Sequence, residues 1–493
     1  MYLGIDVGTS EVKVVLVDPD QHIAASAGAP LEVARPHPLW SEQEPDAWWR
    51  AAQSAVAEIQ AGHARELAAV RGIGLSGQMH GAVLLDSGDR VLRPAILWND
   101  TRSAEECAEL ERRAPGSRRI TGNMAMPGFT APKLLWVARH EPDVMRRTAV
   151  VLLPKDYVRW RMTGEHVSEM SDSAGTLWLD VARREWSDTM LAATGLERRH
   201  MPRLIEGTAA SGQLRPDVAR AWGMGDGVVV AGGGGDNAAS AVGLGVVADG
   251  QAFISLGTSG VLFVANDGYR PNPDRGVHTF CHALPGVWHQ MAVLLSAASC
   301  LRWAVHVTGA ADEVALLAEI EQVDPAAAAR APLFLPYLSG ERTPHNDAFA
   351  QGVWFGLRHD TDRAALGYSV LEGVAFGLAD GYDALRDAGG VVRAASLTGG
   401  GSRSRHWARL IASALDLPLA LTEGSAVGAA LGAARLGQLA AQPDADVASV
   451  CAPPRTIEDI APERVWRDAL LPRFERFRAL YPPLRPLFRE ATT

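Results

Sequence analysis

The sequence predicts an α/β fold built from two duplicated halves, and three observations support this prediction. Strand-like apolar runs alternate with amphipathic helical stretches along the 493 residues, which is typical of α/β layers. Residues 252–265 resemble residues 3–16, and both segments have the pattern of strand, turn and strand. A repeat spaced by half the chain indicates two similar domains rather than a solenoid, whose repeats are much shorter.

The repeat contains six identical positions at a constant offset of 249 residues. These are Ile5/Ile254, Gly8/Gly257, Thr9/Thr258, Ser10/Ser259, Val12/Val261 and Val15/Val264. Because the identities fall within two matching strand–turn–strand patterns, we expect a first domain over residues 1–245 and a second over residues 246–493.

In the first half, three strands are expected before the first helix, and two more strands after it. β-branched and small apolar residues between turn residues predict the strands, and Pro45-Asp46 opens the amphipathic helix. The expected strands are 2–7, 12–17, 23–33, 72–76 and 82–86, and the expected helix is 45–59.

The second half continues the alternation with longer helices. Helices are expected at 296–307, 362–386, 402–415 and 425–438, with a final helix near 464–480. Short strands are expected at 394–398 and 419–422, and surface loops rich in Pro, Gly and Asp at 266–276 and 442–456.

The composition is that of a compact globular protein, with 47% hydrophobic and 21% charged residues. A net charge of −10 gives the whole chain no electrostatic reason to bind nucleic acid. Its apolar runs are far shorter than the roughly 20 residues that span a bilayer. The chain opens MYLGIDVG without the basic segment of a signal peptide, and its four scattered cysteines suit reduced thiols. We therefore expect a cytoplasmic protein without a membrane or nucleic-acid partner, and a homodimer is one admissible assembly.

Two related turns are candidate phosphate-binding loops. Asp6-Val-Gly8-Thr9-Ser10 lies between two expected strands, where backbone N–H groups and hydroxyls can face phosphate oxygens and glycine permits close approach. Ser255-Leu-Gly257-Thr258-Ser259 would offer a second loop from the other half. Because Asp6 aligns with Ser255, only the first loop has a carboxylate that can hold Mg²⁺ directly or through water. One such loop alone is more often a plain polar turn, but the pair favours phosphate binding.

Two glycine-rich segments follow strand-like runs. The first ends at Asp236, which either caps the following helix or acts as a general base where the glycines admit a substrate. The second contains Gly399, Gly400 and Gly401, where adenine and ribose could lie against bare backbone, unless the segment is only a tight strand-to-helix turn. The small-residue helix from Gly424 onward suits close contact between the halves.

A third cluster, Ser76-Gly-Gln78-Met79-His80-Gly81, follows an expected strand. Gln78 and His80 can hydrogen-bond sugar hydroxyls while Met79 covers an apolar face, although a lone histidine is more often structural. A further polar cluster contains Trp98, Asn99 and Asp100.

No GxxxxGK[ST] or GxGxxG motif occurs, which argues against a P-loop kinase and against a dinucleotide-dependent oxidoreductase. Of the basic residues only Lys13, Lys133 and Lys155 are lysines, a skew that a coding bias for arginine explains.

In this order the motifs resemble the FGGY family of carbohydrate kinases, from Met1 to the C-terminal helix. The resemblance implies two ribonuclease-H-like domains of the actin/hexokinase superfamily with the active site in the cleft between them. It implies ATP and Mg²⁺, with Asp236 as the catalytic base and Asp6 near the metal. The residues expected to bind ATP are Gly8, Thr9, Ser10, Lys13, Gly257, Thr258, Gly399, Gly400 and Gly401. The residues expected to bind the sugar are Gln78, Met79, His80, Trp98, Asp100 and Asn237.

Within the family, segments 36–43, 76–81, 97–100 and 337–345 are similar to bacterial members that phosphorylate D-xylulose. The resemblance thus implies ATP-dependent conversion of D-xylulose to D-xylulose 5-phosphate. Two departures are visible, because four glycines precede Asp236 where three are expected, and Glu11 stands where a small residue is expected. An inward-pointing Glu11 would place a negative charge near the phosphates and weaken ATP binding.

Three alternatives remain in view. A kinase of the same fold could act on another ketose or polyol, such as D-ribulose, but Gln78-Met79-His80 argues against this. A non-catalytic sugar or nucleotide sensor would be expected to have lost Asp6 or Asp236, and both are present. An actin-like filament former is disfavoured because nothing in the sequence has the character of a polymerisation insert.

Overall fold

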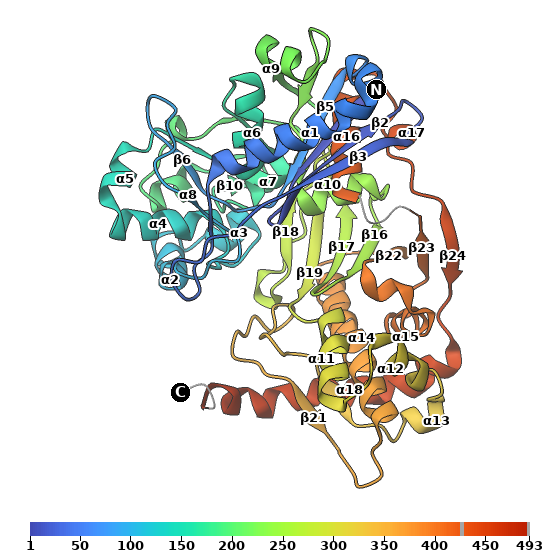
Figure 1. Cartoon of the computed structure of the whole chain (residues 1–493). Helices are drawn as coiled ribbons and strands as arrows, with labels where there is room; N and C mark the ends of the chain where they lie inside the picture. Colours follow the sequence, from blue (N-terminus) through green and yellow to red (C-terminus); the bar gives the residue numbers. More distant parts are fainter. Residues whose placement is uncertain (424–427, 491–493) are drawn as a thin grey trace.

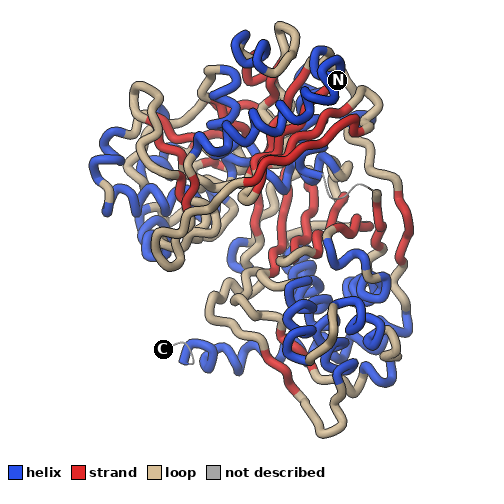
Figure 2. Tube along the Cα trace, viewed as in Figure 1, coloured by secondary structure: helices blue, strands red, loops and turns tan. Residues whose placement is uncertain are grey.

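The computed structural model describes residues 1–423 and 428–490, and in them two seven-stranded sheets form the centres of the two halves. Figure 2 shows the two groups of strands as separate layers with helices lying around each. The α/β fold class and the duplication are therefore confirmed. No helix in these two ranges combines the length and the apolar character needed to cross a membrane.

The first sheet has the strand order β13-β14-β5-β1-β2-β3, with β15 pairing β5 off that path. Its strands are β1 (Tyr2–Val7), β2 (Glu11–Val17), β3 (Ile23–Pro30), β5 (Gly72–Gly77), β13 (Ala210–Gln213), β14 (Val229–Ala231) and β15 (Gly234–Gly235). Side chains alternate between its faces, so Leu3, Ile5 and Val7 join the core with helix α1 (Pro45–Ala68), while Gly4 faces the backbone of helix α16 (Gly428–Ala441). Both faces of β1 are thus covered, which explains its near-complete burial.

The second sheet has the order β18-β19-β17-β16-β22-β23-β24. Its strands are β16 (Gln251–Leu256), β17 (Gly260–Asn266), β18 (His278–Cys281), β19 (Trp288–Leu294), β22 (Ala394–Thr398), β23 (Leu419–Thr422) and β24 (Thr456–Ile460). The bounds of β16 and β17 lie 249 residues after those of β1 and β2, as the repeat predicts. The pairing register differs by one residue: Gly4 pairs with Val15, but Phe253 pairs with Phe263. The second turn is therefore one residue tighter than the first.

A lobe of short elements is inserted between β5 and β13 of the first sheet, and β4, which precedes α1 in the chain, joins it by pairing with β7. Its helices are α2 (Ala104–Arg113), α3 (Ser117–Thr121), α4 (Thr130–His140), α5 (Pro142–Arg147), α6 (Pro154–Thr163), α7 (Met170–Ala174) and α8 (Asp188–Ala193). Its two-stranded pairings are β4 (Glu42–Gln43) with β7 (Ala95–Ile96), β6 (Val83–Leu85) with β8 (Val150–Leu152), β9 (Val167–Glu169) with β12 (Arg203–Ile205), and β10 (Leu179–Asp180) with β11 (Glu185–Trp186). Its apolar core also contains Phe263 and Phe280 of the second sheet, so the lobe is packed against both halves.

The remaining helices complete the layers around the sheets. In the first half these are α9 (Pro216–Ala221) and α10 (Asp236–Gly243). In the second half they are α11 (Ala298–Thr308), α12 (Glu313–Ile320), α13 (Pro325–Ala328), α14 (Arg363–Asp387), α15 (Arg405–Leu415), α17 (Val447–Val450) and α18 (Arg464–Glu490), together with the strand pair β20 (Leu333–Leu335) and β21 (Val353–Phe355). In Figure 1 the α18 ribbon, in red, leads toward the C-terminus at the lower left of the view.

Helix α16 comes from the second half of the sequence but lies on the first sheet, as Figure 1 shows. Glycines make this approach possible: a Cβ atom at Gly74 would lie 1.9 Å from the carbonyl oxygen of Ala433, and one at Gly432 would lie 1.8 Å from that of Ala239 in α10. The contact between halves expected of the small-residue helix is therefore confirmed from Gly428 onward. Residues 424–427, where that helix was expected to begin, lie outside the described residues.

The expected element bounds agree best where strands are short and well marked. β22 and β23 match the expected ranges, and α14 begins one residue after its capping residue Asp362. Two expectations were too short: α1 continues to Ala68 beyond a kink at His63, and α18 continues to Glu490 despite four internal prolines. The expected loop at 442–456 contains the short helix α17.

Candidate active site

The ends of β1 and β15, which lie on either side of β5, bring Asp6 and Asp236 to the same edge of the first sheet. Asp6 is the penultimate residue of β1 and lies opposite Ser76 of β5 in the parallel register. On the other side of β5, Gly234 pairs with Ser76 and Gly235 with Gly77. Asp236 follows directly as the first residue of α10, so both carboxylates stand at the carboxyl edge of the same sheet.

The charge of Asp6 affects the ionisation of Asp236. Burial, followed by the nearby charge of Asp6, raises the pKa of Asp236 to about 6. Asp236 Oδ1 accepts hydrogen bonds from the backbone N–H (2.7 Å) and the side-chain amide (3.0 Å) of Asn237, which leaves Oδ2 as the more basic atom. The capping position of α10 is Gly235, with no side-chain cap, so Asp236 does not have the geometry of a helix cap. A carboxylate with this pKa is suited to accept a proton near neutral pH.

Asp6 has the character of a cation ligand. Its Oδ1 atom is buried and has no hydrogen-bond partner among the described residues, and burial raises the pKa of its carboxyl group. A buried oxygen without a donor is costly unless another group satisfies it. Magnesium prefers carboxylate oxygen and water as ligands, so Asp6 fits the metal that the sequence implies.

The first candidate phosphate loop is held by a network of amides. Gln43 Nε2 donates to the Thr9 carbonyl oxygen (2.8 Å), and Thr9 Oγ1 donates to Gln78 Oε1 (3.1 Å). Gln78 Nε2 donates to Gln43 Oε1 (2.9 Å) and to the Gly8 carbonyl oxygen (3.3 Å), while Trp98 Nε1 donates to Thr9 Oγ1 (3.0 Å). The structure thus places Gln78 and Trp98 against the loop, where they fix Thr9. Their expected contacts with the sugar stay predictions.

Lys13 and Glu11 form an ion pair at the start of β2. Lys13 Nζ lies 3.6 Å from Glu11 Oε1, and Lys13 stands opposite Asp6 in the register of β1 and β2. The extra negative charge of Glu11 is therefore partly offset by its neighbour. Both side chains retain solvent exposure, so the pair is weak and either group can turn to a ligand.

The second phosphate loop and the candidate adenosine loop are adjacent, because β16 pairs with β22 and Ser255 lies opposite Thr398. The carbonyl oxygens of Gly257 and Thr258 accept hydrogen bonds from the N-terminal region of α11, at 2.8 Å from Ala298 N and 2.9 Å from Ala297 N. Gly399 has a left-handed φ of 86°, and a Cβ atom at Gly400 would meet nothing within 4 Å. Gly401 is instead buried against Leu256, so of the three glycines Gly400 offers the open backbone surface.

Met79 and His80 lie beside the loop that carries Asp236. A Cβ atom at Gly235 would lie 2.9 Å from Met79 Cγ, which places Met79 directly against that loop. His80 has a left-handed φ of 72°, and its Nδ1 lies 2.7 Å from the Gly175 carbonyl oxygen. Burial lowers the pKa of His80 to about 3, so its ring is neutral and Nδ1 donates to that carbonyl.

Asp100 is committed to the protein itself. Its Oδ2 accepts hydrogen bonds from Ser41 N (2.6 Å) and Arg102 Nη2 (2.7 Å), and its Oδ1 from Arg102 N and Nε (2.9 Å each). Both side chains are fully buried. Asp100 therefore has a structural role in holding Ser41 and Arg102, and its expected contact with the sugar stays a prediction.

Several supporting residues escaped the sequence analysis. Lys133 Nζ donates to the carbonyl oxygens of His80 (2.9 Å) and Gly128 (2.6 Å), and so holds the backbone at His80. Lys155 is fully buried against Gly77. Lys13, which was already expected to bind ATP, pairs opposite Asp6. All three lysines of an arginine-rich chain thus lie around the site, and the lysine–arginine skew was the signal available for finding them.

The chain is similar to known carbohydrate kinases in sequence and in fold. The family model for the N-terminal domain of the FGGY family of carbohydrate kinases matches residues 1–243, and that for the C-terminal domain matches residues 252–441. Over 487 residues the chain is 52% identical to xylulose kinase of Escherichia coli (strain K12), covering 99% of this chain and 100% of that protein. The crystal structure of a xyloylose kinase from Brucella ovis matches with a TM-score of 0.95 and 53% identity over 99% of both chains. The xylulose kinase structure from Rhodospirillum rubrum matches with a TM-score of 0.92 and 29% identity, again over 99% of both chains.

Proposed function

The chain belongs to the FGGY family of carbohydrate kinases, and on that premise we propose that it transfers the γ-phosphoryl group of ATP to D-xylulose and forms D-xylulose 5-phosphate. We choose D-xylulose as the substrate because the chain is 52% identical to a xylulose kinase over nearly the whole length of both proteins. The aligned 487 residues cover 99% of this chain and 100% of that protein. We place the reaction in the cytoplasm.

In the proposed mechanism Asp236 acts as the general base. Its carboxylate accepts the proton of the terminal hydroxyl group of the ketose while that oxygen attacks the γ-phosphorus in line with the leaving group. Asn237 holds Oδ1, which directs the free Oδ2 toward the substrate. General bases of this kind contribute about 100- to 10,000-fold to a rate.

The two Gly-Thr-Ser loops face the triphosphate from the two halves. Their backbone N–H groups and hydroxyls would offset charge on the phosphate oxygens, and the Gly399–Gly401 segment would accept the nucleoside. Mg²⁺ bound near Asp6 would supply further charge neutralisation. We draw the boundary between the two domains after residue 245. Asp6 and Asp236 then belong to the first domain, and the second phosphate loop belongs to the second domain.

The test is a coupled ADP-release assay with a panel of pentuloses and pentitols. The proposal predicts the highest kcat/KM for D-xylulose, with markedly lower values for D-ribulose and for alditols. A higher kcat/KM for another sugar would assign the chain to a different substrate within the same family. ADP release without any sugar dependence would remove the kinase assignment itself.

A further inference from the structure

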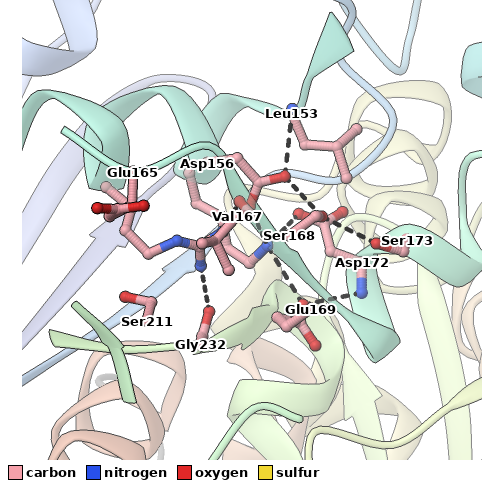
Figure 3. A network of polar contacts seen from close by, with 12 residues as sticks. Leu153, Asp156, Glu165, Val167, Ser168, Glu169, Asp172, Ser173, Ser211 and Gly232 are labelled. Atoms are coloured by element: carbon pink, nitrogen blue, oxygen red, sulfur yellow. Dashed lines mark hydrogen bonds and ion pairs between the residues drawn. The ribbon is translucent and has the colours of Figure 1, made fainter. Parts of the chain in front are cut away.

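A cluster of five ionisable side chains lies wholly inside the first half, beneath the loop that carries Asp236. Its members come from α6, β9 and α7, and each is fully excluded from solvent: Lys155, Asp156, Arg159, Glu169 and Asp172. Lys155 Nζ lies 3.0 Å from Asp156 Oδ1, 3.2 Å from Glu169 Oε1 and 2.8 Å from Asp172 Oδ2. Figure 3 shows Asp156, Ser168, Glu169 and Asp172 gathered around one centre.

The cluster is rigid because each buried charge depends on its partners. Arg159 donates to Asp156 Oδ1 (2.5 Å) and to the carbonyl oxygens of Val167 and Gly232. Ser168 Oγ donates to Asp156 Oδ2 (2.7 Å). Removing one member of a buried ion pair leaves an uncompensated charge, which makes such groups hard to displace.

Two contacts connect this cluster to the glycine run before the base. Arg159 holds the carbonyl oxygen of Gly232, the first glycine of the run. At the last glycine, the backbone N–H of Gly235 donates to Ser171 Oγ (3.0 Å), and Ser171 Oγ donates in turn to Glu169 Oε1 (3.0 Å). Gly235 directly precedes Asp236, so the path from the ion cluster to the base is Glu169, Ser171 and the Gly235 amide.

Helix α7, which carries Ser171, also lies next to Met79 and His80, two of the residues expected to bind the sugar. The carbonyl oxygen of Gly175, the capping residue that follows α7, accepts the hydrogen bond from His80 Nδ1 (2.7 Å). A Cβ atom at Gly175 would lie 2.8 Å from Met79 Cε, so α7 is also in contact with Met79. One short helix therefore touches both the loop of the base and the residues expected to bind the sugar.

We infer that Ser171 is a positioning residue for Asp236, and that the buried ion cluster serves as its fixed support. The inference rests on the proposed role of Asp236 as general base. Four successive glycines allow the backbone more conformations than any other sequence. The path of the backbone through residues 232–235 must therefore be fixed by contacts with other parts of the chain. Misplacing a reacting group by about 1 Å can lower a rate by about 100-fold, which makes such an anchor consequential.

The chain offers a matched control in the same helix. Ser173 is also fully buried, but its Oγ donates to Ser168 Oγ (2.8 Å), and it has no hydrogen bond to the glycine run. Ser171→Ala and Ser173→Ala each remove one buried hydroxyl group, so both are expected to lower the melting temperature by similar amounts. Ser171→Ala should lower kcat by roughly 10- to 100-fold while the KM values for ATP and sugar change less than about twofold. Ser173→Ala should keep kcat within about twofold of the parent protein.

An equal effect of the two substitutions on kcat, whether large or absent, would overturn the inference. If Ser171→Ala fails to fold, the isosteric pair Ser171→Thr and Ser171→Val replaces it, since only threonine keeps the hydroxyl group. A kcat at least about tenfold higher for threonine than for valine supports the anchor, and equal values refute it.

Asp236→Asn measured alongside separates this inference from the proposed function. If Asp236→Asn retains most of its turnover, Asp236 is not the general base, and the positioning role of Ser171 is refuted as well. If Asp236→Asn is inactive while Ser171→Ala and Ser173→Ala behave alike, the base stands and only the anchor is refuted.

Discussion

Replacing Gly432 in α16 by alanine tests how the two halves are joined. A Cβ atom there would lie 1.8 Å from the carbonyl oxygen of Ala239 and 2.9 Å from the backbone nitrogen of Gly243, both in α10. A comfortable contact needs about 3.5 Å, so the two helices would have to separate by roughly 1.5 Å. Backbone atoms cannot rotate away as a flexible side chain can, so we expect a cost at the upper end of the usual 1–3 kcal/mol for overpacking.

The helix propensity of alanine offsets about 1 kcal/mol of this cost, since glycine is a poor helix former. The net loss is therefore about 2 kcal/mol, which for a domain of this size lowers the melting temperature by roughly 4–8 °C. Because α10 begins with Asp236, its displacement should also lower kcat by about tenfold or more.

The assay is thermal unfolding with kcat measured on the same preparations. Gly62→Ala is the control, because it is an exposed glycine of α1 whose added Cβ meets nothing within 4 Å. It should leave kcat unchanged and keep or slightly raise the melting temperature. If Gly432→Ala behaves like Gly62→Ala in both measurements, the close packing of α16 on α10 is refuted.

Two further substitutions examine the metal and the sugar. Asp6→Ala should abolish most Mg²⁺-dependent turnover while sugar binding persists, because Asp6 Oδ1 is a buried oxygen without a hydrogen-bond partner among the described residues. A Mg²⁺ titration at saturating ATP checks this, and an unchanged titration curve contradicts it. His80→Ala should raise the KM for D-xylulose and narrow its kcat/KM advantage over D-ribulose by about 5- to 100-fold, the range for an unpaired buried polar group, with the KM for ATP unchanged. An unaltered ratio between the two sugars would mean that His80 is purely structural.

The repeat could be predicted from the sequence because each of its two copies is formed by residues that follow one another along the chain. β16 and β17 have the predicted offset since strand–turn–strand patterns are local in the chain. The one-residue difference in register could not be seen, because Phe253 has an apolar residue at either candidate partner position, Phe263 or Val264. Nothing in the local pattern distinguishes the two.

The main parts of the candidate site were predicted through motifs, but their supports were not. Asp236 was expected at a helix start after glycines, and it occupies that position. Its anchor Ser171 lies 64 residues away from Gly235 along the chain, in a lobe whose short helices have weak local signals. Such a contact depends on the tertiary packing of α6, β9 and α7, which a single sequence does not specify.

The role of Asp236 is the central claim, and Asp236→Asn tests it most directly. The measurement is the single-turnover rate of D-xylulose phosphorylation at saturating ATP and Mg²⁺, with nucleotide affinity and melting temperature as controls. We expect a rate lowered by about 100- to 10,000-fold with nucleotide affinity unchanged, because the substitution keeps the hydrogen bonds at Oδ1 and removes the basic oxygen. A variant that retains more than half of the parent rate would contradict the claim and leave Asp236 with a structural role at the start of α10.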